Sequence, residues 1–232
     1  MRRALAFLTP IGGAVPPSPD AVRWFPIAGL LIGLAVGGVW WGAAQFWPPA
    51  VAAALAVVAD LALTGMLHFD GLVDSADGLL PPLPRERRLD AMADPGVGAF
   101  GVAAGVSGLL LRLSAFAAMS PAPLLVAAVW CASRTVMAWT IGSVPYARPG
   151  GLAAAFMGHT TRVVAGGILL SIFVGVLGQG SRGALAVGTC VLGASAVVNF
   201  ARRRIDGFTG DVLGAAGFIG ETIGLLVAAG RW

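Results

Sequence analysis

The feature of this sequence that most limits its fold is a series of long apolar runs separated by short polar segments. A helix needs about 20 apolar residues to cross the hydrocarbon core of a membrane. Seven runs approach or exceed that length: 24–46, 50–67, 99–119, 124–142, 163–178, 184–200 and 212–229. Only 11% of the residues are charged, against about 25% in soluble domains. We therefore predict an all-α, polytopic membrane bundle of about seven transmembrane helices (6–8), with residues 1–232 forming one domain.

The basic residues are all arginines, and they divide unevenly between the two sides of such a bundle. Eleven fall on the side of the N-terminus: Arg2, Arg3, Arg23, Arg85, Arg87, Arg88, Arg148, Arg162, Arg202, Arg203 and Arg204. Only Arg182 and Arg231 fall on the other side. Because positive charge concentrates on the cytoplasmic side, we expect the N-terminus and the long loops to be cytoplasmic. The net charge of +4 then reflects topology, and we expect no nucleic-acid partner.

Three aspartates, Asp70, Asp74 and Asp77, lie where an apolar run meets a charged loop. In a helix, their spacing of four and three residues places all three carboxylates on one face. Such a stripe is repulsive unless a cation or a cationic substrate compensates it. Oxygen ligands with room for water suit Mg²⁺ or Mn²⁺, and a magnesium site typically uses a few carboxylates and substrate phosphates. The pattern predicts a Mg²⁺ site in which these three aspartates are the ligands.

The loop that follows, RERRLDAMADPGVGAFG (85–101), carries both charges and glycines. Its first half is equally consistent with an exposed helix of weak ion pairs and with arginines, Arg85 and Arg88, that hold phosphate oxygens. Asp94 differs because glycines follow it and allow the backbone to come close to a ligand. We predict catalytic use of Asp94.

A second acidic element is IDGFTGDVLG (205–214), which contains Thr209, Gly210 and Asp211. One interpretation is a helix N-terminus, with Thr209 as the cap and Asp211 in the first turn. The other is a contribution to the cation site, with Asp211 catalytic and Thr209 and Gly210 binding substrate.

Four charged residues fall inside the apolar runs: Asp60, Arg112, Arg134 and Glu221. Such residues must be paired or line a polar cavity. Asp60 and Arg112 are expected to neutralise each other. Arg134 either reaches a substrate phosphate or pairs with Glu221. His68, next to the carboxylates, either binds substrate or makes a plain hydrogen bond.

Several stretches together resemble the cobalamin synthase family, the adenosylcobinamide-GDP ribazoletransferases. They are TGMLHFDGLVDSADGL (64–79), RRLDAMADPGVGAFG (87–101), SRTVMAW with PYARPGG (133–151), and GFTGDVLGA with Glu221. They occur in the same order as in the family and cover nearly the whole chain. One departure is PIGG at 10–13, where the family usually has an arginine and Leu-Pro.

The resemblance implies a multi-pass enzyme of a bacterial or archaeal cytoplasmic membrane, with its active site facing the cytoplasm. It would join adenosylcobinamide-GDP to α-ribazole, or to its 5′-phosphate, with Mg²⁺ as cofactor and GMP as the leaving group. We expect Mg²⁺ on Asp70, Asp74 and Asp77 to bridge the pyrophosphate. The partners expected are these substrates and the lipid bilayer, and an oligomer is compatible with the sequence.

The sequence leaves two rival interpretations. A CDP-alcohol phosphotransferase needs Ala-Arg where this chain has Asp74-Ser75. An ion-coupled transporter would place its carboxylates near the bilayer midplane, often with repeat symmetry, whereas these lie at one face and no repeat is evident.

Overall fold

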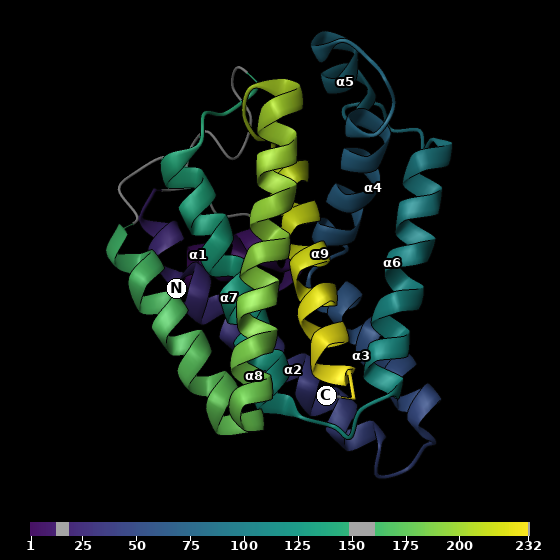
Figure 1. The fold of residues 1–232 in the computed structure, drawn as a ribbon, viewed down its shortest axis with the longest axis vertical. Coiled ribbons are helices and arrows are strands. Elements are labelled where there is room, and N and C mark those ends of the chain that lie inside the picture. Colours follow the sequence, from purple (N-terminus) through teal and green to yellow (C-terminus); the bar gives the residue numbers. More distant parts are fainter. Residues whose placement is uncertain (13–18, 149–160, 232) are drawn as a thin grey trace.

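The computed structural model describes residues 1–12, 19–148 and 161–231, and these fold into helices joined by short loops (Figure 1). The helices are α1 (Arg2–Leu8), α2 (Phe25–Ala43), α3 (Pro49–Leu63), α4 (Leu67–Leu79), α5 (Arg85–Ala91), α6 (Ala99–Ala117), α7 (Pro123–Ser143), α8 (Thr161–Ile205) and α9 (Gly210–Ala229), with 3₁₀ turns η1 (Pro10–Gly12) and η2 (Pro19–Trp24). No strand occurs in the described ranges, where the only β-type pairing is an isolated bridge between Tyr146 and Phe208. The all-α prediction is confirmed.

The predicted number of spans is also confirmed. Five elements are long and apolar enough to cross a membrane, and the bent pair of α3 and α4 makes a sixth. The element α8 contains two helical arms, because Gln179 and Gly180 have non-helical backbone angles. Figure 1 shows the arms meeting in a sharp bend. Counted separately, these arms raise the total to seven passes, matching the runs 163–178 and 184–200.

The centre of the bundle is α7, which packs against α2, α8 and α9. Almost every side chain of α7 is buried. Small residues allow the close approach: a Cβ at Gly29 would lie 2.4 Å from the Trp130 carbonyl oxygen, and one at Gly33 would lie 2.7 Å from that of Val126. Small residues at helix contacts are typical of membrane bundles, where the backbones themselves pack together.

A break between α3 and α4 positions the acidic segment. The two helices meet at an angle of 86°. Gly65 and Met66 both have positive φ at this point, +56° and +60°, a conformation that glycine adopts readily and other residues seldom do. The break directs α4 along α6 and α9, so its carboxylates lie beside the first turn of α9.

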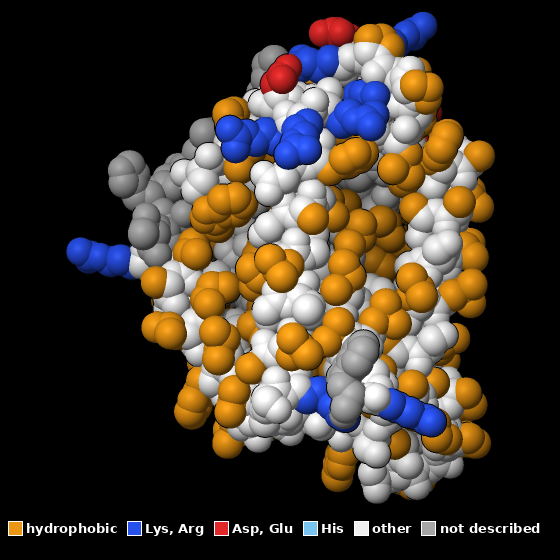
Figure 2. Space-filling model, in the orientation of Figure 1, with side chains coloured by type: hydrophobic (Ala, Val, Ile, Leu, Met, Phe, Trp, Pro, Cys, Tyr) orange, Lys and Arg blue, Asp and Glu red, His pale blue; other side chains and the backbone are white. Residues whose placement is uncertain are grey.

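The surface has the charge pattern of a membrane protein. Apolar side chains cover the middle of the face in Figure 2, and blue arginine side chains gather near both ends. Exposed apolar residues are numerous on α6 and α8, among them Leu110 and Phe173. Arg182 and Arg231, the two arginines assigned to the far side, line a single polar pocket of about 550 Å³.

The orientation in the membrane can be tested by cysteine labelling. We expect the loops at 68–98, 143–162 and 201–211 to face the cytoplasm, although residues 149–160 of the second loop lie outside the described residues. In a background lacking Cys131 and Cys190, a cysteine at the exposed Ala93 should resist an impermeant thiol reagent in intact cells. A cysteine at Ser181, in the bend of α8, should react. The reverse pattern would show the opposite orientation.

Candidate active site

The candidate site lies where the backbone of α4 packs directly against the backbone of the first turn of α9. A Cβ at Gly71 would lie 2.6 Å from the carbonyl oxygen of Asp211 and 3.0 Å from Cα of Gly214. Only glycine at position 71 permits this approach without a shift of backbone. The contact brings Asp70 and Asp74 of α4 next to Asp211 of α9, about 140 positions away in the chain.

The carboxylates of this cluster repel one another. The negative charge of Asp74 is repelled most strongly by Asp70 and less strongly by Asp211 and Asp77, and it is attracted by the positive charge of Arg148. Asp70 is exposed, whereas Asp74 and Asp211 are half-buried. Half-buried carboxylates are screened less by water than exposed ones, so the repulsion costs folding free energy unless a cation relieves it. We refer to Asp70, Asp74 and Asp211 as the acidic cluster.

Asp77 shares the helical face with Asp70 and Asp74 but has other partners. One carboxylate oxygen accepts a hydrogen bond from the Gly98 amide at 2.7 Å, and the other accepts one from the Gly101 amide at 2.8 Å. These amides belong to the first turn of α6, which otherwise lacks partners for its N–H groups. Asp77 therefore caps α6 and ties it to α4, and its place among metal ligands stays a prediction.

A Mg²⁺ ion fits the acidic cluster only with help from a substrate. In the described part of the chain, no group of three or more His, Cys, Asp or Glu side chains is arranged to hold one metal ion. Mg²⁺, however, is commonly held by one or two carboxylates, several waters and substrate phosphates. Asp70 and Asp74 supply such oxygens one helical turn apart.

The N-terminus of α9 is capped as one of the two interpretations expects. The Thr209 hydroxyl accepts a hydrogen bond from the Val212 amide at 3.3 Å and donates one to Asp211 at 3.2 Å. Thr209 is fully buried, so its hydroxyl is committed to this turn. Gly210 is exposed, and open space surrounds the position of its missing Cβ. Gly210 is thus the more suitable of the two to lie against a substrate.

Arg148 is the cation nearest the acidic cluster, a position that the sequence did not predict. Its guanidinium lies 3.4 Å from the Asp211 carboxylate and donates a hydrogen bond to the Leu89 carbonyl. The bridge between Tyr146 and Phe208 holds this loop beside α9. Burial raises the pKa of the Tyr146 phenol, which therefore stays neutral. Arg148 lies in the sequence motif PYARPGG (145–151), which marked this loop as a feature of interest. No pattern of residue spacing, however, predicts that the loop contacts residue 211.

The two arginines predicted to bind phosphate in α5 have structural contacts. Arg85 donates to the carbonyls of Ile205 and Ala147 and forms an ion pair with Asp206 at 3.1 Å. Arg88 is buried and donates to the carbonyls of Gly78 and Leu79, at the end of α4. Both arginines therefore join loops that frame the site, and neither contacts the acidic cluster.

Asp94 belongs to the loop between α5 and α6. It is exposed, and its carboxylate accepts a hydrogen bond from the Gly96 amide at 2.8 Å. Among the described residues, no ion pair or hydrogen bond connects it to α4 or α9. Its predicted catalytic role gains no support from this arrangement.

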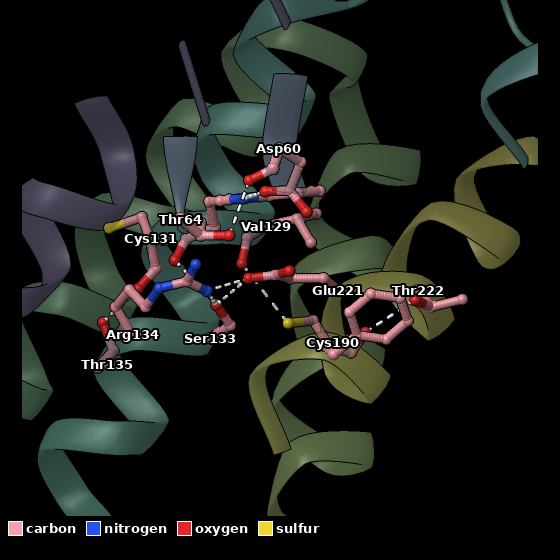
Figure 3. A network of polar contacts seen from close by, with 12 residues as sticks. Asp60, Thr64, Val129, Cys131, Ser133, Arg134, Thr135, Cys190, Glu221 and Thr222 are labelled. Atoms are coloured by element: carbon pink, nitrogen blue, oxygen red, sulfur yellow. Dashed lines mark hydrogen bonds and ion pairs between the residues drawn. The ribbon is translucent and has the colours of Figure 1, made fainter. Parts of the chain in front are cut away.

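A buried network of four charged side chains joins α3, α6, α7 and α9 (Figure 3). Arg112 of α6 forms ion pairs with Asp60 of α3 and with Glu221 of α9. Glu221 also pairs with Arg134 of α7 and accepts a hydrogen bond from Ser133. The network contains two positive and two negative charges. The expected pairing of Asp60 with Arg112 is confirmed. Arg134 forms an ion pair with Glu221, which is one of the two roles that the sequence left open for it.

Arg134 and His68 each keep buried polar atoms that make no hydrogen bond in the described structure. Nε and Nη2 of Arg134 and Nδ1 of His68 are buried without a hydrogen-bond partner in the described structure. Both side chains lie close to Gly217: a Cβ there would be 3.2 Å from His68 Cδ2 and 3.6 Å from Arg134 Nη1. Both therefore lie against α9 about two turns after Asp211. The direct substrate contacts predicted for them remain predictions.

The Arg134 pairing gives a test that separates its two roles. Because Glu221 holds the guanidinium in a buried ion pair, Arg134→Lys should lower the free energy of unfolding by roughly 1–3 kcal/mol, the cost of poorly satisfied buried polar groups. Thermal unfolding in detergent would measure this. An unchanged melting temperature together with weaker substrate binding would instead favour a direct phosphate contact.

The fold and the site together define a polytopic membrane protein whose acidic cluster lies where α4 meets the first turn of α9, and whose core contains a neutral ion-pair network. The model of the family described as cobalamin-5-phosphate synthase matches residues 1–229. The chain belongs to this family.

Three relatives illustrate the match, and each is named adenosylcobinamide-GDP ribazoletransferase. The protein of Bradyrhizobium diazoefficiens is 38% identical over 99% of this chain and 92% of its own length. That of Roseiflexus is 34% identical over 96% and 86%, and that of Deinococcus radiodurans is 38% identical over 95% and 81%. No solved structure matches this chain.

Proposed function

We propose that this protein joins adenosylcobinamide-GDP to α-ribazole, or to its 5′-phosphate, and releases GMP. The observation that carries the proposal is the backbone contact between α4 and α9, which gathers Asp70, Asp74 and Asp211 beside the N-terminus of α9 and Arg148. Carboxylates for a metal, a helix N-terminus and an arginine are the parts that phosphoryl transfer uses. The names of the relatives supply the substrates.

Asp70 and Asp74 would hold Mg²⁺, with substrate phosphates completing its ligands. Bound there, the ion would neutralise charge on the pyrophosphate. A ribose hydroxyl of α-ribazole would attack the phosphorus on the cobinamide side. The new P–O bond forms as the bond to the GMP phosphate oxygen breaks, and GMP departs with that electron pair. Asp211 would accept the hydroxyl proton.

Arg148 and Gly210 would position the phosphates. Arg148 is the nearest cation to the cluster and already contacts Asp211, so a substrate phosphate could share its guanidinium. Gly210 leaves open space at the start of α9, where a helix N-terminus attracts anions.

The reaction would take place at the cytoplasmic face of a bacterial or archaeal membrane. The arginine bias supports this orientation, and the cysteine experiment above tests it. The decisive experiment for the activity is incubation of the purified protein in lipid with adenosylcobinamide-GDP, α-ribazole and Mg²⁺. Appearance of GMP together with the joined product supports the proposal, and substrates that stay intact at every Mg²⁺ concentration contradict it.

Arg148→Gln should raise KM for adenosylcobinamide-GDP more than it lowers kcat, because the neutral amide cannot grip a phosphate. A loss of about tenfold in kcat/KM or more is expected, the scale of one charge-assisted hydrogen bond. Arg87→Gln, which removes an exposed arginine of α5, is the matched control. Equal kinetics in the two variants would remove Arg148 from the site.

A further inference from the structure

An apolar groove runs between α6 and α8, and α4 and α9 form its floor. Two adjoining hollows of about 320 and 250 Å³ share Leu72, Ala104, Ile219 and Ile223 in their walls. The groove exists because α6 packs mainly against α3, α4 and α9, whereas α8 packs mainly against α7 and α9. In Figure 2 the space-filling surface is hollowed along this line, and the side chains in it are apolar.

The groove has the dimensions of an alkyl chain. Its lining positions on α9 extend from Ala215 to Leu226, which is about 16 Å at 1.5 Å per residue. The groove lies in the part of the surface that is covered by apolar side chains, among them the exposed Val106 and Leu110 of α6. A chain lying in the groove would therefore enter sideways from the bilayer.

Three arginines, Arg202, Arg203 and Arg204, lie at one end of the groove. The Arg204 guanidinium lies 4.8 Å from the ring centre of Phe200 and donates a long hydrogen bond, 3.4 Å, to the Leu79 carbonyl. Phe200 and Leu79 both line the groove, so Arg204 is held at its mouth. Arg202 and Arg203 are exposed beside it.

These guanidiniums lack carboxylate partners. In the described structure no ion pair involves Arg88, Arg202, Arg203 or Arg204, whereas Arg85 has two and Arg148 has one. Burial, and then the nearby charge of Arg204, lower the pKa of Arg88. Two cations close together without an anion favour binding of an anion from outside the protein.

A buried hydroxyl lies one turn below this charge. Ser75 is only 4% exposed, lines the groove, and its Oγ has no hydrogen-bond partner among the described residues. Ser75 and Leu79 are separated by one helical turn, about 6 Å along the axis. An acceptor such as an ester carbonyl, placed just below a phosphate on Arg204, would satisfy the hydroxyl.

We propose that this groove binds an anionic phospholipid. One acyl chain lies between α6 and α8, an ester carbonyl accepts the Ser75 hydrogen bond, and the phosphate lies against Arg204. The charge pattern selects an anionic headgroup, since a zwitterionic one would bring its own cation to a cluster of arginines. The site lies on the other side of α4 from the acidic cluster, and the proposal does not depend on the reaction proposed above.

Native mass spectrometry of the full-length protein in detergent can test the site. Phosphatidylglycerol and phosphatidylcholine with identical acyl chains are offered in equal amounts, and we expect retained phosphatidylglycerol to dominate. Arg204→Gln should reduce that preference by about fivefold, as loss of one basic contact at a membrane surface implies. Ala104→Phe should reduce binding of both lipids by filling the groove.

Two matched variants serve as controls. Arg182→Gln removes an exposed arginine from the opposite end of the protein, and Ala103→Phe adds the same bulk on an exposed position of α6. Both should keep the preference. Melting temperatures in lipid-free detergent identify any variant that fails to fold, and Arg204→Gln and Ala104→Phe probe the site independently.

Three results would overturn the proposal. They are equal retention of the two lipids by the native protein, full retention by a folded Ala104→Phe variant, and displacement of phosphatidylglycerol by excess GMP or inorganic phosphate. The last result would assign the arginines to a soluble phosphate ligand. GMP release, measured separately, reports on the proposed reaction, so the two proposals can fail independently.

Discussion

Asp74→Asn should lower the rate of GMP release by about 10²–10³-fold, the scale of removing one preorganised electrostatic group. Asp74 is half-buried at the centre of the acidic cluster and carries the repulsion of Asp70, Asp211 and Asp77. The amide preserves the shape of the side chain but is a far weaker ligand for Mg²⁺. Because it also relieves repulsion, the melting temperature in detergent should stay the same or rise. Activity and stability should therefore move independently.

The control for this variant is Asp90→Asn, which neutralises an exposed carboxylate on α5 and should leave turnover near normal. Titration with Mg²⁺ adds a second readout. If Asp74 helps to hold the ion, the residual activity of Asp74→Asn should need more Mg²⁺ to saturate. Near-normal turnover at limiting Mg²⁺ would remove Asp74 from the site.

Glu221→Ala should destabilise the protein by about 3–5 kcal/mol, the typical cost of removing one partner from a buried ion pair. Glu221 binds two arginines of two other helices, Arg112 and Arg134, and is 1% exposed. Its loss leaves the buried network with one uncompensated positive charge. Unfolding in detergent by an increasing fraction of denaturing surfactant would measure the change.

Two comparisons sharpen this test. Glu86→Ala removes an exposed carboxylate whose contact with Arg85 is 4.0 Å long, and it should cost little because exposed pairs contribute about 0–1 kcal/mol. The double replacement Glu221→Leu with Arg134→Met removes one charge of each sign and should recover much of the stability. Equal destabilisation by Glu86→Ala and Glu221→Ala would contradict the role assigned to the network.

The local and compositional features of this protein could be predicted from its sequence. The apolar runs predicted the bundle because a bilayer demands helices of that length and apolarity. The spacing of Asp70, Asp74 and Asp77 predicted one helical face, and α4 is a helix over these positions. Thr209 was a candidate N-cap because capping depends on the next three residues only. Each of these inferences uses interactions within one turn or within one run.

The partners of the charged side chains depended on the tertiary structure. Asp77 shares a face with Asp70 and Asp74, yet it binds amides 21 and 24 positions further along the chain. Arg148 reaches Asp211 because the bridge between Tyr146 and Phe208 holds its loop beside α9. Glu221 joins Arg112 to Arg134 because α9 packs against both α6 and α7. Electrostatic and hydrogen-bonding energies depend on distances of a few ångströms, and helix packing sets those distances. Sequence spacing can place a charge on a helix face, but only the packed bundle brings it to its partner.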